Sequence, residues 1–200
     1  MINFCSSEIP RFSCANHKLN LAVRAAITID IEFTQMLKDL NKANAHVRRS
    51  ITLNNAFKTQ KCKLRLENLT RWSSAYLMLL SVSKAFKKNL FNEANQCPVD
   101  IQIVEIYLGI LEPAYVLSQQ FQFNHSSIAD VIPSIKRLIY TFKQMDPPES
   151  QKKLCKYLVT SVLEKFNYEL NSNVYKVKNL IIIFKIFLSF FQYLKRWRRY

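Results

Sequence analysis

Apolar positions recur at intervals of three and four along most of the chain, which is the spacing of one face of an α-helix. The first run has its apolar positions at Leu19, Ala22, Val23, Ala26 and Ile27, and the second at Phe33, Met36, Leu37, Leu40 and Val47. The β-branched stretch Thr28-Ile29-Asp30-Ile31 lies between them and is expected to break or bend the helix. We therefore predict two successive helices, the second with three cations toward solvent: Lys42, Arg48 and Arg49.

The same spacing predicts four further helices in the rest of the chain. They run from Trp72 to about Ala94, over Val99–Gln122, from Ser127 past Phe142, and across Leu154–Phe166. Loop residues separate them at Asn95-Gln96-Cys97-Pro98 and Asp146-Pro147-Pro148. Pro113 is expected to kink its helix or to mark a join with another one. Ser127-Ile128-Ala129-Asp130 resembles a capping box at the start of the next helix.

Two features of the helix predicted to begin near Trp72 are ambiguous: the residue that caps its start and the role of Trp72. Thr70 or Asn68 can serve as its N-cap. Its expected apolar face consists of Trp72, Ala75, Tyr76, Leu79, Val82 and Phe86. Trp72 is either the large anchor of a core or, beside Arg71, part of a surface where the ring stacks on a base and the guanidinium binds phosphate. The sequence alone leaves both interpretations open.

Residues 50–69 form a basic connector. Within it, Lys63-Leu64-Arg65-Leu66 alternates with a period of two, so a short extended piece is possible there. The chain has one Gly in 200 residues, far below the usual ~7%. Many hairpins are therefore improbable, and every glycine-rich phosphate loop is excluded. The expected fold class is mainly α, with at most a minor extended segment.

The net charge of +15 is concentrated in two short segments. Residues 42–71 hold eight basic and one acidic residue, and residues 176–200 hold seven basic and no acidic residue. Such clustering favours a polyanionic partner, either nucleic acid or an acidic membrane face, although two solvated segments without a ligand are the alternative. The candidate nucleic-acid-binding residues are Arg48, Arg49, Lys58, Lys61, Lys63, Arg65, Arg71 and Trp72.

Metal and nucleophile chemistry has little support in the residue pattern. Five cysteines without a CxxC pair indicate reduced thiols in the cytosol or nucleus. Cys14 and His17 can share one helix face, but a zinc site needs three or four ligands and no second half is recognisable. Asp30, Glu32 and Asp39 do not have the spacing of a two-metal site. We expect no resident metal or other cofactor.

Two stretches together resemble the hAT superfamily of transposases. Arg11-Phe12-Ser13-Cys14-Ala15-Asn16-His17-Lys18-Leu19-Asn20-Leu21-Ala22-Val23 is similar to that family's CxxH-x-L-N-L-x-V segment. Leu69-Thr70-Arg71-Trp72-Ser73-Ser74-Ala75-Tyr76-Leu77-Met78-Leu79 is similar to its T-R-W-N-S-x-Y-x-M-L segment, with Ser73 where Asn is usual. The region from Leu111 to Phe142 resembles the family's helical region, and the likeness ends near Val177.

The resemblance implies an RNase H-like core that is split by an all-helical insertion. Residues 1–50 would be a remnant of the core, with Cys14 and His17 as structural motif residues. Residues 51–175 would be the insertion, which places Arg71 and Trp72 near DNA. Residues 176–200 would be a divergent basic and apolar tail. The family's catalytic Asp, Asp and Glu, which need Mg²⁺ or Mn²⁺, would fall outside the chain. These implications predict a truncated, catalytically inactive protein.

Taken together, the sequence predicts a nuclear protein with weak, nonspecific affinity for DNA. The alternative is a transposon-derived helical module that binds another protein, in the nucleus or the cytoplasm. Residues 180–194 are apolar, but they are about 15 in number and include Lys185, whereas a spanning helix needs about 20 apolar residues. We therefore do not expect a membrane anchor.

Overall fold

The computed structural model describes residues 14–68, 70–91, 95–122 and 128–171. The helices in these residues are α1 (Ala15–Ile29), α2 (Ile31–Arg49), α3 (Ile51–Thr59), α4 (Ser73–Lys87), α5 (Ile101–Gln120), α6 (Ile128–Gln144), α7 (Glu149–Lys165) and α8 (Asn167–Asn171). No β-strand occurs in the described ranges. The prediction of a mainly α fold is confirmed.

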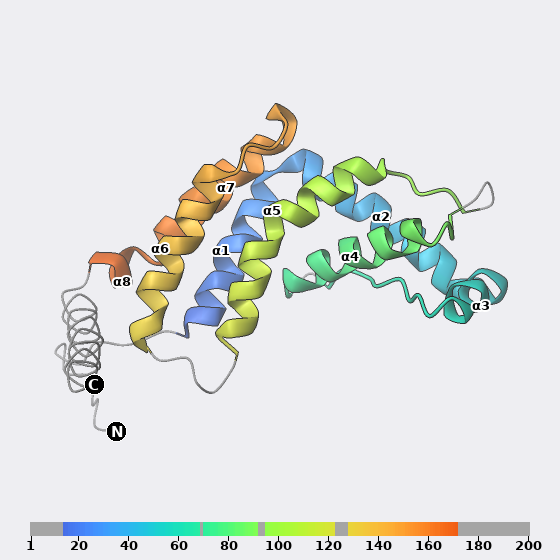
Figure 1. The fold of residues 1–200 in the computed structure, drawn as a ribbon, viewed down its shortest axis with the longest axis horizontal. Helices are drawn as coiled ribbons and strands as arrows, with labels where there is room; N and C mark the ends of the chain where they lie inside the picture. The colour runs from blue at the N-terminus through green and yellow to red at the C-terminus, as the bar shows by residue number, and fades with distance from the viewer. Residues whose placement is uncertain (1–13, 69, 92–94, 123–127, 172–200) are drawn as a thin grey trace, which may run out of the picture.

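The helices form a bundle from which an arm extends (Figure 1). Helices α1, α5, α6 and α7 lie side by side, with α1 packed most extensively against α7. Helices α2, α3 and α4 extend to one side, where α4 packs along α5. Helix α5 takes part in both regions. One continuous apolar core runs through them, from Leu19 in α1 to Phe166 after α7.

The predicted core faces of α1 and α2 are confirmed, because all ten of their apolar positions are buried. The expected break between them is also present. Asp30 ends α1 and caps α2, since its Oδ1 accepts a hydrogen bond from the backbone N–H of Phe33 at 3.0 Å. That bond satisfies one of the donors that the first turn of a helix leaves unpaired. The predicted solvent positions Lys42, Arg48 and Arg49 are exposed.

Helix α5 bends midway along its length (Figure 1). Pro113 lies inside it and has no N–H to donate to the carbonyl of Gly109, four residues earlier. The expected kink therefore has its usual physical cause. Among the described helices, α5 is the one long and apolar enough to cross a membrane. Its apolar face packs against α1, α4, α6 and α7, which is the environment of a core helix.

The prolines after α6 stop it as predicted, and α7 begins directly after Pro148. The expected core positions of these helices are buried, except that Tyr157 is half-buried: Ile135, Leu138, Ile139, Phe142, Leu154, Leu158, Ser161, Val162 and Phe166. Pro133 is tolerated in the second turn of α6 on its exposed side. The proposed capping residue Ser127 lies outside the described residues.

Three predictions for α4 are wrong in detail. The helix begins at Ser73, and neither Thr70 nor Asn68 caps it. Asn68 Oδ1 instead accepts from the N–H and the hydroxyl of Thr70, at 3.0 and 2.9 Å, so both candidate caps are engaged in a local turn. The helix ends at Lys87 rather than near Ala94, and Phe86 is 42% exposed instead of lying on the core face.

The prediction of a basic connector without helix is corrected by α3, which occupies its first half. Ser50 caps this helix, its Oγ accepting from the N–H of Leu53 at 3.3 Å. Residues 62–68 follow without helix or strand. Leu64 is buried while Lys63 and Arg65 are exposed, so the alternation of period two exists without a paired strand.

The segments that we distinguished in the sequence are not separate packing units among the described residues. Helix α1, from residues 1–50, has its largest interface with α7, from residues 51–175. The proposed division thus remains a hypothesis about origin. Residues 176–200, including the apolar stretch and its flanking cations, lie outside the described ranges, as does Cys5.

Candidate nucleic-acid interface

The second half of the basic connector is held by side chains of the neighbouring helices. The backbone N–H of Arg65 donates to Ser81 Oγ of α4 at 2.9 Å, and the carbonyl of Arg65 accepts from Asn44 Nδ2 of α2 at 2.9 Å. The N–H of Glu67 donates to Asn41 Oδ1 at 2.9 Å. These three bonds take the place of a partner strand and fix the connector between α2 and α4.

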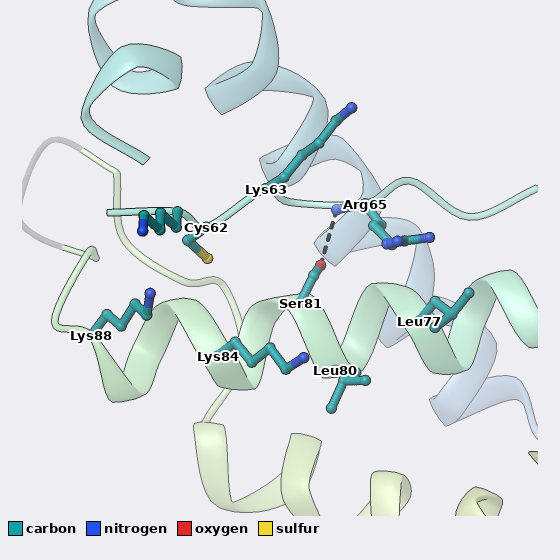
Figure 2. A pocket seen from close by; sticks show the side chains of 9 residues that line it. Cys62, Lys63, Arg65, Leu77, Leu80, Ser81, Lys84 and Lys88 are labelled. Atoms are coloured by element: carbon teal, nitrogen blue, oxygen red, sulfur yellow. Dashed lines mark hydrogen bonds between the residues drawn. The ribbon is translucent and has the colours of Figure 1, made fainter. Parts of the chain in front are cut away.

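Two adjoining pockets lie between this connector and the outer face of α4. The first, of about 300 Å³, is lined by Lys61, Cys62, Lys63, Arg65, Leu77, Leu80, Ser81, Lys84 and Lys88 (Figure 2). The second, of about 310 Å³, is lined by Arg48, Lys63, Leu64, Arg65, Leu66, Ser74 and Leu77. They share Lys63, Arg65 and Leu77, so together they form one groove, which we call the connector groove.

The connector groove is strongly electropositive. Its lining contains six cations and no acidic residue: Arg48, Lys61, Lys63, Arg65, Lys84 and Lys88. None of these six makes an ion pair with a carboxylate among the described residues. Some cations elsewhere are paired, as in Arg24 with Glu67 at 3.3 Å. Unpaired cations along a concave surface provide the field that attracts a polyanion.

Four of the predicted binding residues meet in this groove: Arg48, Lys61, Lys63 and Arg65. Three others are exposed but line neither pocket. Arg49 ends α2, Lys58 lies on α3, and Arg71 lies in the turn before α4. They are available to a ligand larger than the groove, but the fold does not gather them with the four.

Two lining residues, Lys84 and Lys88, were missed in the sequence. Residues 72–175 hold ten basic and nine acidic residues, so counting charge by segment concealed them. The signal was present in the helical spacing. Leu77, Ser81, Lys84 and Lys88 follow each other at four, three and four residues, which places them on one face of α4.

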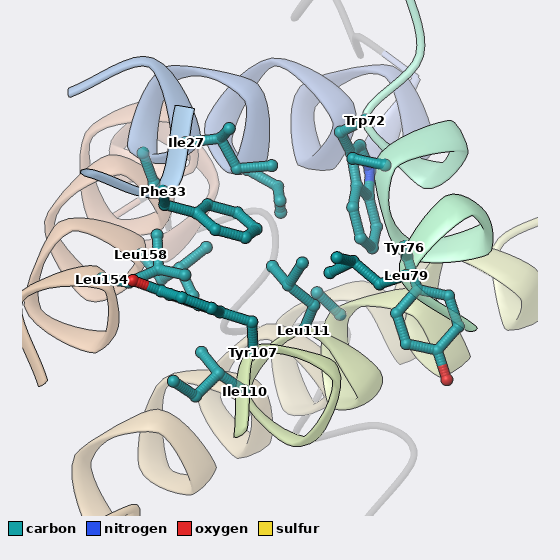
Figure 3. Packing of buried hydrophobic residues seen from close by; sticks show 14 of the residues in the cluster. Ile27, Phe33, Trp72, Tyr76, Leu79, Tyr107, Ile110, Leu111, Leu154 and Leu158 are labelled. Atoms are coloured by element: carbon teal, nitrogen blue, oxygen red, sulfur yellow. The ribbon is translucent and has the colours of Figure 1, made fainter. Parts of the chain in front are cut away.

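Trp72 lies on the opposite side of α4 from this groove. Its side chain is 1% exposed and packs among residues of α1, α4 and α5 (Figure 3). Its ring meets Tyr115 edge to face, with centroids 6.4 Å apart, and Tyr115 stacks on Tyr76 at 4.3 Å. The backbone N–H of Trp72 donates to Asn20 Oδ1 at 3.3 Å. Burial thus supports the core interpretation of Trp72, since a ring at this position has no face open to a base.

Cys14 and His17 are both exposed at the start of α1. Their neighbours Asn16 and Asn20 are the residues that face the core: Asn16 Oδ1 accepts from Ser118 Oγ of α5 at 2.9 Å. Within the described ranges no three His, Cys, Asp or Glu side chains gather as metal ligands would. Burial raises the pKa of the Cys62 thiol, partly offset by the charges of Lys88 and Lys84, so this thiol in the groove floor is protonated at neutral pH.

Lys61 occupies a backbone conformation that usually selects glycine. Its φ is 51°, directly after α3, where the N–H of Cys62 bonds the carbonyl of Phe57 at 2.9 Å and the N–H of Lys61 bonds that of Lys58 at 2.8 Å. This pair of bonds is a Schellman motif, in which the left-handed residue is most often Gly. Lysine there costs about 1 kcal/mol.

We therefore expect Lys61→Gly to leave the free energy of unfolding unchanged or to raise it by up to about 1 kcal/mol, because relief of the backbone outweighs the added freedom of the unfolded chain. The same change removes one groove cation. Chemical denaturation measures the stability. Lys58→Gly is the matched control, and it should destabilise the protein because Lys58 lies inside α3, where glycine is unfavourable. A clear loss of stability in Lys61→Gly would contradict the assignment of the turn.

No family model matches the chain, and none of the curated proteins compared with it matches.

Proposed function

We propose that this protein is an hAT-transposase-like DNA-binding protein of the nucleus, whose connector groove holds the phosphate backbone without reading sequence. The observation that carries the proposal is the set of six unpaired cations lining the groove. Phosphate contacts by Lys and Arg give affinity and carry no base information directly. Among the described residues no aromatic side chain lines the groove, so these residues offer no stacking platform for a base.

The link to the transposases rests on the two sequence stretches that resemble them. In the structure these stretches are in contact, because Asn20 Oδ1 of the first accepts a hydrogen bond from the backbone N–H of Trp72 of the second. Their resemblance is therefore carried by residues that pack together in one core. For the 200 residues of this chain, the activity that we propose is binding and not strand cleavage.

The decisive measurement is the affinity for a fluorescent DNA duplex as a function of salt. If four groove cations meet phosphates, the slope of log K against log salt is about −3.6, and affinity falls about 100-fold between roughly 50 and 200 mM salt. Lys63→Gln/Arg65→Gln removes the two cations shared by both pockets and should make the slope shallower by about 1.8. Two duplexes of unrelated sequence should bind equally.

The matched control is Lys152→Gln/Lys153→Gln, which removes the same charge from α7. Lys152 pairs with Asp146 at 2.9 Å and Lys153 with Glu32 at 3.9 Å, far from the groove in sequence and already neutralised. This control also accounts for the basic residues 176–200, which every variant retains. Absence of binding at low salt, or an equal loss in control and groove variants, would refute the proposal. A stable complex with protein that salt does not weaken would favour the interaction module.

A further inference from the structure

The part of the connector groove around Cys62 differs from the rest because cations lie on both of its walls. Lys61, Lys63 and Arg65 belong to the connector, Lys84 belongs to α4, and Lys88 is the residue that directly follows α4. Figure 2 shows Lys84 and Lys88 along the helix below the connector, with Cys62 between the two walls. The neighbouring pocket, in contrast, takes Arg48, Lys63 and Arg65 and no cation from α4.

Lys84 and Lys88 are oriented toward this pocket and are not neutralised. Lys88 Nζ donates to the carbonyl oxygen of Gln60 at the end of α3. The charges of Lys88 and Lys84 both reach the Cys62 thiol, whose pKa they lower against the larger effect of burial. The adjacent Lys87 is different: it pairs with Glu105 at 3.0 Å, and this contact lowers the pKa of that carboxyl.

Five cations around about 300 Å³ repel one another unless an anion occupies the space. A single phosphate carries too little charge to balance them, whereas several phosphates on a small molecule match both the charge and the volume, which is at the lower end for ligand pockets. The Ser81 hydroxyl already accepts from Arg65 N–H and donates to the carbonyl of Met78, at 2.9 and 2.7 Å, so the wall between the cations is preorganised.

We propose that the Cys62 pocket binds a compact polyphosphate anion, held by Lys61, Lys84 and Lys88 with the stems of Lys63 and Arg65 at its rim. The lysine side chains are long enough for their ammonium groups to close over such a ligand. Leu77 and Leu80 line the pocket and no aromatic ring from the described residues does, so the phosphates and not a nucleobase supply the affinity. This function is distinct from the proposed DNA binding, although all five cations of the pocket also belong to the connector groove.

The test is calorimetric titration of the full chain with tripolyphosphate, inositol hexakisphosphate and ATP. We expect all three to bind, with ATP no tighter than tripolyphosphate because the base finds no stacking partner. Lys84→Gln/Lys88→Gln should weaken each about tenfold or more; α3 keeps its end because the backbone hydrogen bonds of Lys61 and Cys62 that close it do not involve Lys88. Thermal melting without ligand checks that the parent chain and this double variant fold equally.

Two controls make the test specific. Lys87→Gln removes the same kind of charge from the same helix but Lys87 lines neither pocket of the groove, and Arg48→Gln removes a cation of the neighbouring pocket alone. Neither should change the affinity for tripolyphosphate by more than about twofold. If either weakens it as much as the double variant does, binding is diffuse surface attraction and the inference fails.

The outcome is independent of the proposed DNA function. Arg48→Gln should weaken DNA binding while leaving tripolyphosphate binding intact, because DNA is expected to extend through both pockets. Lack of polyphosphate binding together with salt-dependent DNA binding would overturn this inference alone. Polyphosphate binding without any DNA binding would overturn the proposed function alone.

Discussion

Replacing Trp72 with alanine is expected to lower the free energy of unfolding by about 3–5 kcal/mol, which is the usual cost of removing a large aromatic side chain from a core. Trp72 is among the largest fully buried side chains and contacts Tyr115 edge to face. Its removal leaves a cavity where α1, α4 and α5 meet, and these helices contribute much of the core. Urea denaturation followed by far-UV circular dichroism measures the change.

Trp72→Phe is the matched control and should cost less than half as much, because it keeps an aromatic ring and loses less volume. DNA binding by the folded Trp72→Phe protein should equal that of the parent chain, since the connector groove lies on the other side of α4. A stable Trp72→Ala protein that has lost DNA affinity would show instead that the tryptophan acts at the nucleic-acid surface.

Replacing Lys18 with methionine is expected to destabilise the protein by about 3 kcal/mol. Lys18 of α1 pairs with Glu169 of α8, whose side chain is 3% exposed while that of Lys18 is 19% exposed. Glu169 Oε2 is buried and has no hydrogen-bond partner in the described part of the chain. Methionine matches the lysine stem but leaves a carboxylate buried without its counter-charge, which is among the costlier changes in a protein.

The double variant Lys18→Met/Glu169→Leu should recover most of this loss, since an apolar pair of similar volume often replaces a buried ion pair without net cost. Lys38→Met is the control for charge, because Lys38 is exposed on α2 and makes no ion pair within the described ranges. Denaturation curves for the parent chain, the single variants Lys18→Met and Glu169→Leu, and the double variant give the coupling energy. A Lys18→Met protein as stable as the parent chain would show that the pair contributes nothing to the fold.

Helical spacing predicted most of this fold because the helices are amphipathic and their apolar faces meet in one core. The faces of α1 and α2 were read correctly, and so was the break at Asp30, where a β-branched run is followed by a capping residue. The start of α4 was misread because Asn68 and Thr70 bond to each other. Good capping residues can be recognised in a sequence, but the sequence does not show which of them already hydrogen-bond to another residue.

The candidate site was predicted only in part, because its residues come from segments that are distant in sequence and meet only in the folded structure. Charge along the connector indicated Lys61, Lys63 and Arg65, which are close in sequence. Lys84 and Lys88 join them only because the hydrogen bond from Arg65 N–H to Ser81 holds the connector against α4, sixteen residues away. The buried position of Trp72 likewise depends on α5, whose packing against α4 no local pattern encodes.

The hydrogen bonds that hold residues 62–68 also affect how this protein contacts other copies of itself. An extended piece with alternating leucines and cations presents free N–H and C=O groups, and such an edge normally invites a strand from another molecule. Here Asn41, Asn44 and Ser81 occupy three of those backbone groups, and the cations beside them repel a second copy. Resistance to edge-to-edge aggregation is thus built into the same polar contacts that position the groove.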